Sequence, residues 1–426
     1  TKKSYMVLTS QDLAPTIREA FATALEGRPG PVLIDVPRDV QLEEAEVEFP
    51  EVTEPALSPL SPETLEAVQR AARLINEAQR PIIISGHGIL ASGASREVKA
   101  LAETTGIPVT TTLLGLGGFP GNHPLSLGML GMHGTYWANM AVDRADVIIG
   151  LGMRFDDRVT GKASTFAPHA RVVHLDIEPT QIGRNVPVEV PLVGDAKAVL
   201  RALLPLATYT DRPEWMGFID SERRHHPSLA IPQSDTLQPQ QVMASLNELL
   251  QENPETVVVT GVGQHQMWAA QFLFFNQSNT FVSSGGQGTM GFEVPAALGV
   301  QAGRPGAPVW SIAGDGGFQM TSQELATATE ANLPIKIALF NNSCLGMVRQ
   351  WQELFFQNHI KATPLTGPDY LKLAEAYGVP AVRVNEQEDV LPALRQAQAH
   401  DGPFLIEFVV DGSANVYPMV GPGCGL

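Results

Sequence analysis

Short β-branched segments alternate with helical segments through most of this 426-residue chain. Buried strands that alternate with helices are typical of mostly parallel sheets with helices on both faces. We therefore predict the α/β fold class, with two doubly wound, mostly parallel-sheet domains and the tail of a third α/β domain. The expected strands are Ile82–Ile84, Val109–Thr112, Val147–Gly150, Val172–Leu175, Val190–Val193, Thr256–Val259, Phe281–Ser283, Val309–Ala313, Ile335–Phe340, Ala381–Val384 and Phe404–Val410.

Two irregular, proline-containing stretches divide this alternation. Ser61 followed by Pro62 is typical of a helix start, so a new domain is expected there. Residues 1–40 hold only two expected strands around one helix, too few to bury a core alone. The predicted organisation is the C-terminal remnant of an N-terminal α/β domain at 1–40, a linker at 41–61, a central α/β domain at 62–204, a linker at 205–237 and a C-terminal α/β domain at 238–426.

Composition excludes several classes of partner. The formal net charge is −17 and no Lys/Arg-rich run interrupts it, so we expect no nucleic-acid binding. The apolar runs are too short to cross a bilayer, so no membrane partner is expected. Two cysteines, Cys344 and Cys424, favour a reducing compartment, and a cytoplasmic location of the bacterial type is predicted. Because the chain starts at Thr1 rather than Met, an organellar transit peptide stays open.

The segment from Ser311 to Met347 contains the most informative polar pattern. We expect the strand Val309–Ala313, a helix at Ser322–Ala331 and the strand Ile335–Phe340 to form one βαβ unit, whose parallel strands end at the same sheet edge. Asp315 and Asn342 follow those ends and can converge on one cation. Carboxylate and amide oxygens suit Mg²⁺. Three glycines (Gly314, Gly316 and Gly317) leave room for a diphosphate at a helix N-terminus.

Together these two motifs resemble the GDG…NN signature of thiamine-diphosphate enzymes, with Cys344 expected to offer its main-chain carbonyl to the metal. The motifs GVGQHQMW (261–268), SSGGQGTMGFEVPAALG (283–299) and LGMVRQWQ (345–352) resemble acetohydroxyacid synthase (acetolactate synthase) in particular. By this resemblance Gln264 and His265 contact the diphosphate, Met290 and Met347 line the thiamine pocket, and Trp351 meets the second keto acid. The further cofactor contacts implied are Gly263, Gly288, Leu345 and Gly346.

The central domain resembles the FAD-binding domain of the same family. The motifs ISGHGI, LGMLGMHG, GMRFDDRVTGK, LDIEP and GDA occur in the family's order. The resemblance implies that Arg28, Arg154 and Arg158 meet FAD phosphates or its ring system, and that Asp176 and Asp195 meet the adenosine part. The other implied FAD contacts are Gly86, His87, Gly88, Thr112, Leu113, Leu130, Gly131, Met132, His133, Gly152, Met153, Asp156, Val159, Ile177 and Ala196.

The resemblance implies decarboxylation of pyruvate and carboligation to a second pyruvate or to 2-ketobutyrate, the first common step of branched-chain amino-acid biosynthesis, with thiamine diphosphate, Mg²⁺ and FAD. It also implies a homodimer or tetramer and a possible regulatory small subunit. The family's catalytic Glu lies in the N-terminal domain and no residue here matches it, so the isolated chain is expected to be inactive. Alternatives are another thiamine-diphosphate enzyme, such as pyruvate oxidase or glyoxylate carboligase, or a non-catalytic cofactor-binding fragment.

Four residues depart from the usual family pattern: Arg38, Gly261, Gln287 and Glu293. Glu293 is the least expected of them, because it puts a charge near the start of a helix that faces the cofactor. Its carboxyl group either changes the polarity of the pocket or points to solvent.

Overall fold

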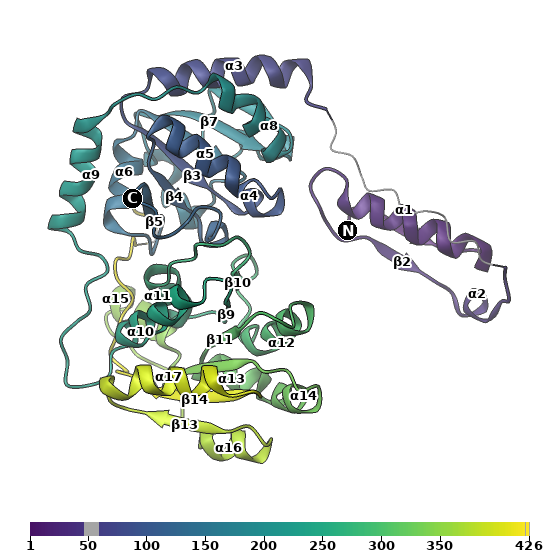
Figure 1. Cartoon of the computed structure of the whole chain (residues 1–426), viewed down its shortest axis with the longest axis vertical. Helices are drawn as coiled ribbons and strands as arrows, with labels where there is room; N and C mark the ends of the chain where they lie inside the picture. Colours follow the sequence, from purple (N-terminus) through teal and green to yellow (C-terminus); the bar gives the residue numbers. More distant parts are fainter. Residues whose placement is uncertain (47–58, 422, 426) are drawn as a thin grey trace.

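The computed structural model describes residues 1–46, 59–421 and 423–425. Two six-stranded parallel sheets lie one after the other along the chain, at 81–193 and 257–409 (Figure 1). The family-independent prediction of an α/β class with two parallel sheets is confirmed. None of the helices within the described ranges is long and apolar enough to cross a membrane.

The first segment of the chain is a small βαβ unit. Strands β1 and β2 pair in parallel, with Ser4 opposite Leu33. Phe21 of the intervening helix is 68% exposed, so this unit by itself buries little of its apolar surface. Most of the expected linker 41–61 falls at 47–58, outside the described residues. The elements are β1 (Ser4–Met6), η1 (Ser10–Asp12), α1 (Leu13–Leu25), β2 (Leu33–Asp35) and α2 (Arg38–Leu42).

The central sheet has the strand order β5-β4-β3-β6-β7-β8, with every pair parallel. Its strands are β3 (Pro81–Ser85), β4 (Val109–Thr111), β5 (Ser126–Met129), β6 (Val147–Leu151), β7 (Arg171–Asp176) and β8 (Val190–Val193). The sequence reading missed β5, whose Gly128 has a φ of +76° that interrupts a regular strand pattern.

Helices cover both faces of this sheet. Helices α3, α5 and α8 pack on one face and α6 on the other, because successive strand residues such as Ile82 and Ile83 point to opposite sides. Ser61 caps α3 as expected, since its side chain accepts a hydrogen bond from the Thr64 N–H at 3.1 Å. The helices and turns are α3 (Pro62–Glu77), α4 (His87–Ala91), α5 (Ser95–Thr105), η2 (Leu113–Gly115), α6 (Tyr136–Arg144), α7 (Asp157–Thr160), η3 (Ala163–Thr165), η4 (Pro179–Gln181), α8 (Ala196–Leu203) and η5 (Leu204–Leu206).

The interpretation of 205–237 as an irregular linker is wrong in part. Helix α9 (Pro213–His225) occupies the middle of this stretch and packs against α6. Trp215 is buried and its indole N–H donates to the Pro81 carbonyl at 3.0 Å. The prolines and histidines that suggested a linker lie at the two ends of the helix, where Pro213 is a favourable first residue.

The C-terminal sheet has the order β10-β9-β11-β12-β14-β13 and is also parallel throughout. Helices α10, α11 and α17 pack on one face, and α12, α13, α14 and α16 on the other. The strands are β9 (Val257–Thr260), β10 (Phe281–Ser283), β11 (Val309–Gly314), β12 (Lys336–Asn341), β13 (Ala381–Val384) and β14 (Phe404–Val409). The helices and turns are α10 (Pro239–Glu252), α11 (Gln264–Phe272), α12 (Glu293–Gly303), α13 (Asp315–Thr321), η6 (Ser322–Glu324), α14 (Leu325–Glu330), α15 (Gly346–Phe355), α16 (Tyr370–Ala376), η7 (Gln387–Asp389) and α17 (Val390–Ala399).

The range expected to be one helix, Ser322–Ala331, holds the turn η6 and the helix α14, and a further helix that was not expected precedes it. This further helix, α13, begins at Asp315 itself, and the turn η6 separates it from α14. This correction matters for the site, because it puts the glycine motif in the first turn of a helix rather than in a preceding loop.

Candidate cofactor and metal site

The candidate site lies where the strand order of the C-terminal sheet reverses. Strands β9 and β11 are neighbours, yet the chain continues outward from them to opposite sides of the sheet. Ligands of open parallel sheets bind beyond the carboxyl ends of the strands at such a point. The segment Gly261–Gln264 follows β9 and Asp315–Gly317 follows β11, so both expected motifs meet there.

Asp315 is a buried carboxylate held by backbone N–H groups. Its side chain is 3% exposed and accepts hydrogen bonds from Gly316 N at 2.9 Å and from Cys344 N at 3.2 Å. Burial raises the pKa of Asp315 to about 6, and the hydrogen bonds from Gly316 and Cys344 oppose that rise. A nearby cation would favour the ionised form of such a group.

The turn after β12 carries Asn342 and is held by its neighbour Asn341. The Asn341 amide donates to Glu407 at 2.7 Å, and its oxygen accepts the Ser343 N–H at 3.0 Å. Ser343 has a φ of +53°, a conformation that non-glycine residues adopt only when their surroundings hold them. This turn therefore brings Cys344 N into contact with Asp315, and it brings the Asn342 side chain into contact with Gln264.

Two buried glutamines link α11 to α15. The Gln264 amide donates to Gln350 at 3.0 Å and to the Ala414 carbonyl at 2.9 Å, while its oxygen accepts from Asn342 at 3.3 Å. Gly346 is required beside them, since a Cβ there would lie 2.0 Å from the Gln264 oxygen. The sequence reading missed Gln350, although its spacing of four residues from Gly346 puts both on one helix face.

His265 packs against the end of β11. A Cβ on Gly314 would lie 2.8 Å from the His265 ring, so glycine is needed there for packing. Burial lowers the pKa of His265 to about 4, and its Nε2 atom has no hydrogen-bond partner among the described residues. The imidazole is therefore neutral, with one nitrogen still unpaired.

A partly open cavity joins these groups. Met290 and Met347 both line it, and so do Trp268 and Phe340, which the sequence reading did not single out. Gly288 and Trp351 are absent from its lining; Trp351 packs edge-on against Phe355 of the same helix. The predicted residues that line the cavity are Gly263, Gln264, His265, Met290, Gly314, Asp315, Gly316, Gly317, Asn342, Cys344, Leu345, Gly346 and Met347.

The donor set fits a magnesium-diphosphate group rather than a metal held by protein alone. Within the described ranges, no cluster of three or more His, Cys, Asp or Glu side chains could hold a metal ion. One carboxylate and one amide oxygen leave most positions of an octahedral Mg²⁺ to carbonyl, water and phosphate oxygens. The glycines at the start of α13 leave the backbone accessible to phosphate.

Two family models match the chain. Residues 261–408 match the C-terminal, thiamine-pyrophosphate-binding domain of thiamine pyrophosphate enzymes, and residues 68–203 match the central domain of the same enzymes. The large subunit of acetolactate synthase from Corynebacterium glutamicum is 46% identical over 99% of this chain and 69% of its own length. This chain belongs to the acetolactate synthase family of thiamine-diphosphate enzymes.

Other acetolactate synthase relatives come from distant organisms. A probable large subunit from Methanocaldococcus jannaschii is 44% identical over 99% of this chain and 73% of its own length. Acetolactate synthase 1, chloroplastic, from Zea mays is 41% identical over 99% of this chain and 68% of its own length. The resemblance inferred from sequence motifs is thus confirmed at the level of the family and of the cofactor thiamine diphosphate.

The central domain holds the residues expected to bind FAD in the acetolactate synthase family. Its strand order reverses between β3 and β6, the arrangement that binds dinucleotides in doubly wound sheets. Gly86 and Gly152 follow these two strands, and a Cβ on Gly86 would lie 2.4 Å from the Gly152 carbonyl oxygen. Glycine is therefore required at position 86 at least partly because the loops after β3 and β6 pack closely together. Asp195 is also occupied locally, since it accepts from Ala198 N at 2.9 Å as the cap of α8.

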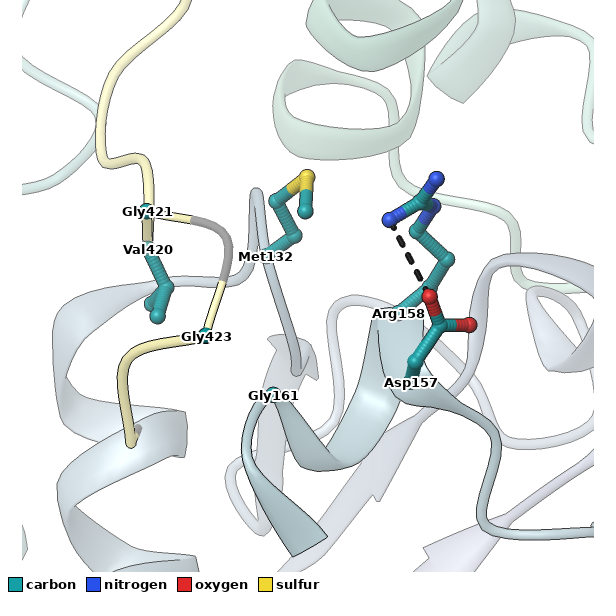
Figure 2. A pocket seen from close by; sticks show the side chains of 7 residues that line it. All are labelled: Met132, Asp157, Arg158, Gly161, Val420, Gly421 and Gly423. Atoms are coloured by element: carbon teal, nitrogen blue, oxygen red, sulfur yellow. Dashed lines mark hydrogen bonds and ion pairs between the residues drawn. The ribbon is translucent and has the colours of Figure 1, made fainter. Parts of the chain in front are cut away.

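A second cavity lies between this domain and the C-terminal segment (Figure 2). Arg158 of α7 lines this cavity and forms an ion pair with Asp157 at 3.3 Å. Met132 also lines the cavity, and its backbone carbonyl accepts a hydrogen bond from Val420 N at 2.8 Å. Arg154 pairs with Asp156 at 3.3 Å. Both arginines are exposed, and Arg28 of the N-terminal segment lies close enough to Glu178, just after β7, to help lower the pKa of that carboxyl group.

Proposed function

We propose that this chain binds thiamine diphosphate and Mg²⁺ in the C-terminal cavity, where pyruvate loses carbon dioxide and its remaining two-carbon unit is joined to a second pyruvate or to 2-ketobutyrate. The observation that carries the proposal is the hydrogen bond from Cys344 N to Asp315, because it ties the two halves of the expected metal site together at 3.2 Å. Asp315, Asn342 and the Cys344 carbonyl would hold the metal.

The protein itself would orient the bound cofactor and shield it from water. Neutral His265, which has a free ring nitrogen, is suited to bind a diphosphate oxygen. Both side-chain N–H groups of Gln264 already donate, to Gln350 and Ala414, so Gln264 would contact the diphosphate through its backbone N–H at the start of α11. Met290 and Met347 supply an apolar wall that excludes water, and exclusion of water strengthens the electrostatic contacts of the site. The bound thiamine diphosphate would supply the carbanion chemistry. Trp351 would select the second keto acid from its place on α15.

FAD is proposed for the carboxyl edge of the central sheet. Support comes from the strand order and from Arg154 and Arg158, which follow β6 in a loop and in α7 respectively. We also propose a homodimer or tetramer, a regulatory small subunit and a cytoplasmic location. The family resemblance and the composition of the chain support these proposals.

The test is binding of thiamine diphosphate, followed by tryptophan fluorescence because Trp268 lines the cavity. Asp315→Asn should weaken binding in the presence of Mg²⁺ at least 100-fold, since it removes the charged ligand, about 3 kcal/mol. The exposed Asp389 supplies the control Asp389→Asn, which should bind as the unmodified chain does. Removal of Mg²⁺ with a chelator should abolish binding by the unmodified chain, and equal binding with and without metal would contradict the proposal.

A further inference from the structure

Glu293 is a carboxyl group buried without a partner. It is the first residue of α12, is fully buried, and neither of its carboxyl oxygens makes a hydrogen bond among the described residues. An unpaired buried polar group is costly, so a residue of this kind calls for an explanation. Of the two outcomes expected from the sequence, exposure to solvent is excluded.

The carboxyl group lies in a recess formed by two glycines. A Cβ on Gly261, just after β9, would lie 2.2 Å from one carboxyl oxygen of Glu293. A Cβ on Gly317, in the first turn of α13, would lie 2.6 Å from the other. No side chain other than hydrogen can therefore stand at either position while Glu293 keeps its place.

We propose that Glu293 is a positioning residue of the diphosphate site, whose carboxyl group fills the recess between Gly261 and Gly317 and fixes the first turn of α13 against the end of β9. The inference rests on the proposed function, because Gly317 lines the cavity proposed for thiamine diphosphate. Glu293 itself does not line that cavity, so it acts through the backbone of Gly317.

The protonated carboxyl group is the form that suits this recess, because an ionised carboxylate would be buried there without a hydrogen-bond partner. Burial raises the pKa of Glu293 to about 7, and the backbone N–H groups of Glu293 and Gly291 oppose that rise although neither meets the geometry of a hydrogen bond to the carboxyl group. The elements packed against α12 carry Asp315, Glu324 and Glu330, and none of them contributes to this shift. At higher pH an unpaired charge behind α13 disturbs the site.

A double-mutant cycle tests the contact directly. Gly261→Ala should weaken binding of thiamine diphosphate about tenfold, because the new methyl group meets the carboxyl group. Glu293→Ala should weaken binding about threefold by leaving the recess empty. The double variant should bind like Glu293→Ala alone, because the clash is gone; effects that simply multiply would overturn the proposal.

Two further measurements distinguish positioning from general stability. Glu293→Gln keeps the shape of the side chain, so its affinity for thiamine diphosphate should match the unmodified chain at pH 6 and exceed it several-fold at pH 8.5. Parallel pH profiles would overturn the role assigned to the proton. If Gly261→Ala unfolds too readily for binding to be measured, recovery of its thermal midpoint in the double variant gives the same coupling, and no recovery refutes it. Failure of the unmodified chain to bind thiamine diphosphate would refute the proposed function itself, and this inference with it.

Discussion

Some glycines around the cavity have neighbours so close that a side chain at the same position would not fit. Gly346 is the clearest case, since a Cβ there would lie 2.0 Å from Gln264 Oε1 and 2.7 Å from Asn342 Nδ2. Both of those residues belong to the proposed site. A small change at Gly346 thus reaches two cofactor contacts at once.

Gly346→Ala should weaken binding of Mg²⁺ and thiamine diphosphate at least tenfold, because the methyl group displaces Gln264 and Asn342. The cost in unfolding free energy should be about 1–3 kcal/mol, as for other overpacked sites. Calorimetric titration and denaturant unfolding measure the two effects. Gly299, in α12, has open space around its Cβ position, so Gly299→Ala should leave binding unchanged. Equal affinities of the two variants would contradict this prediction.

The buried Glu293 should also make stability depend on pH. Its pKa is raised from 4.5 to about 7 in the folded chain, so the folded state holds the proton more tightly. Stability is therefore lost as pH rises from about 4.5 through 7, by about 3 kcal/mol in total. The Gln side chain does not titrate in this range. Denaturant unfolding should show that Glu293→Gln gains stability relative to the unmodified chain between pH 5 and pH 8; a constant difference would disprove this.

At the scale of elements, three neighbouring strands are joined by one buried carboxylate. Glu407 of β14 is 2% exposed, accepts from Asn341 of β12 at 2.7 Å, and accepts from Arg383 of β13 at 2.7 Å. Because Asn341 also holds the turn that carries Asn342, this link extends from the edge of the sheet to the proposed metal site.

Glu407→Ala should lower the unfolding free energy by about 2–4 kcal/mol, because the Asn341 amide and the Arg383 guanidinium both lose their acceptor. It should also weaken Mg²⁺ binding, whereas Glu407→Gln, which keeps one hydrogen bond, should lose less of both. Unfolding curves and metal titrations measure these effects. The exposed Glu388 gives the control Glu388→Ala, with little expected change. If the unfolding free energy falls as predicted but the Mg²⁺ affinity is unchanged, Glu407 stabilises the sheet without supporting the proposed metal site.

At the scale of the whole molecule, the central and C-terminal domains are joined by several polar contacts, some of them buried. The Gln271 amide of α11 is buried and donates to the carbonyls of His133 at 2.9 Å and Tyr417 at 3.2 Å. Backbone bonds add to this, such as Gly121 N to the Phe275 carbonyl at 3.1 Å. His133, one of the residues proposed to contact FAD, lies at this boundary.

Gln271→Ala should loosen this boundary, because the carbonyls of His133 and Tyr417 lose their donor. Hydrogen exchange should become at least tenfold faster around residues 131–135 and 415–419, with no change in the strands of either sheet. Gln251 makes its contacts within the C-terminal domain, so Gln251→Ala should leave this exchange unchanged. Faster exchange throughout both sheets would instead indicate global destabilisation.

The sequence by itself determined the parallel sheets and their carboxyl edges, because the alternation of strands and helices is a local pattern that the chain cannot easily override. It also placed Asp315 and Asn342 at the ends of β11 and β12, where both line the same cavity. It also determined the family, through motifs that each lie beside a strand end. It misjudged α9, whose burial depends on α6, and it could not find Gln350 as a partner of Gln264. Only the tertiary structure decided that Glu293 points inward, because the recess that accepts it is built by Gly261 and Gly317, which come from two other elements of the fold.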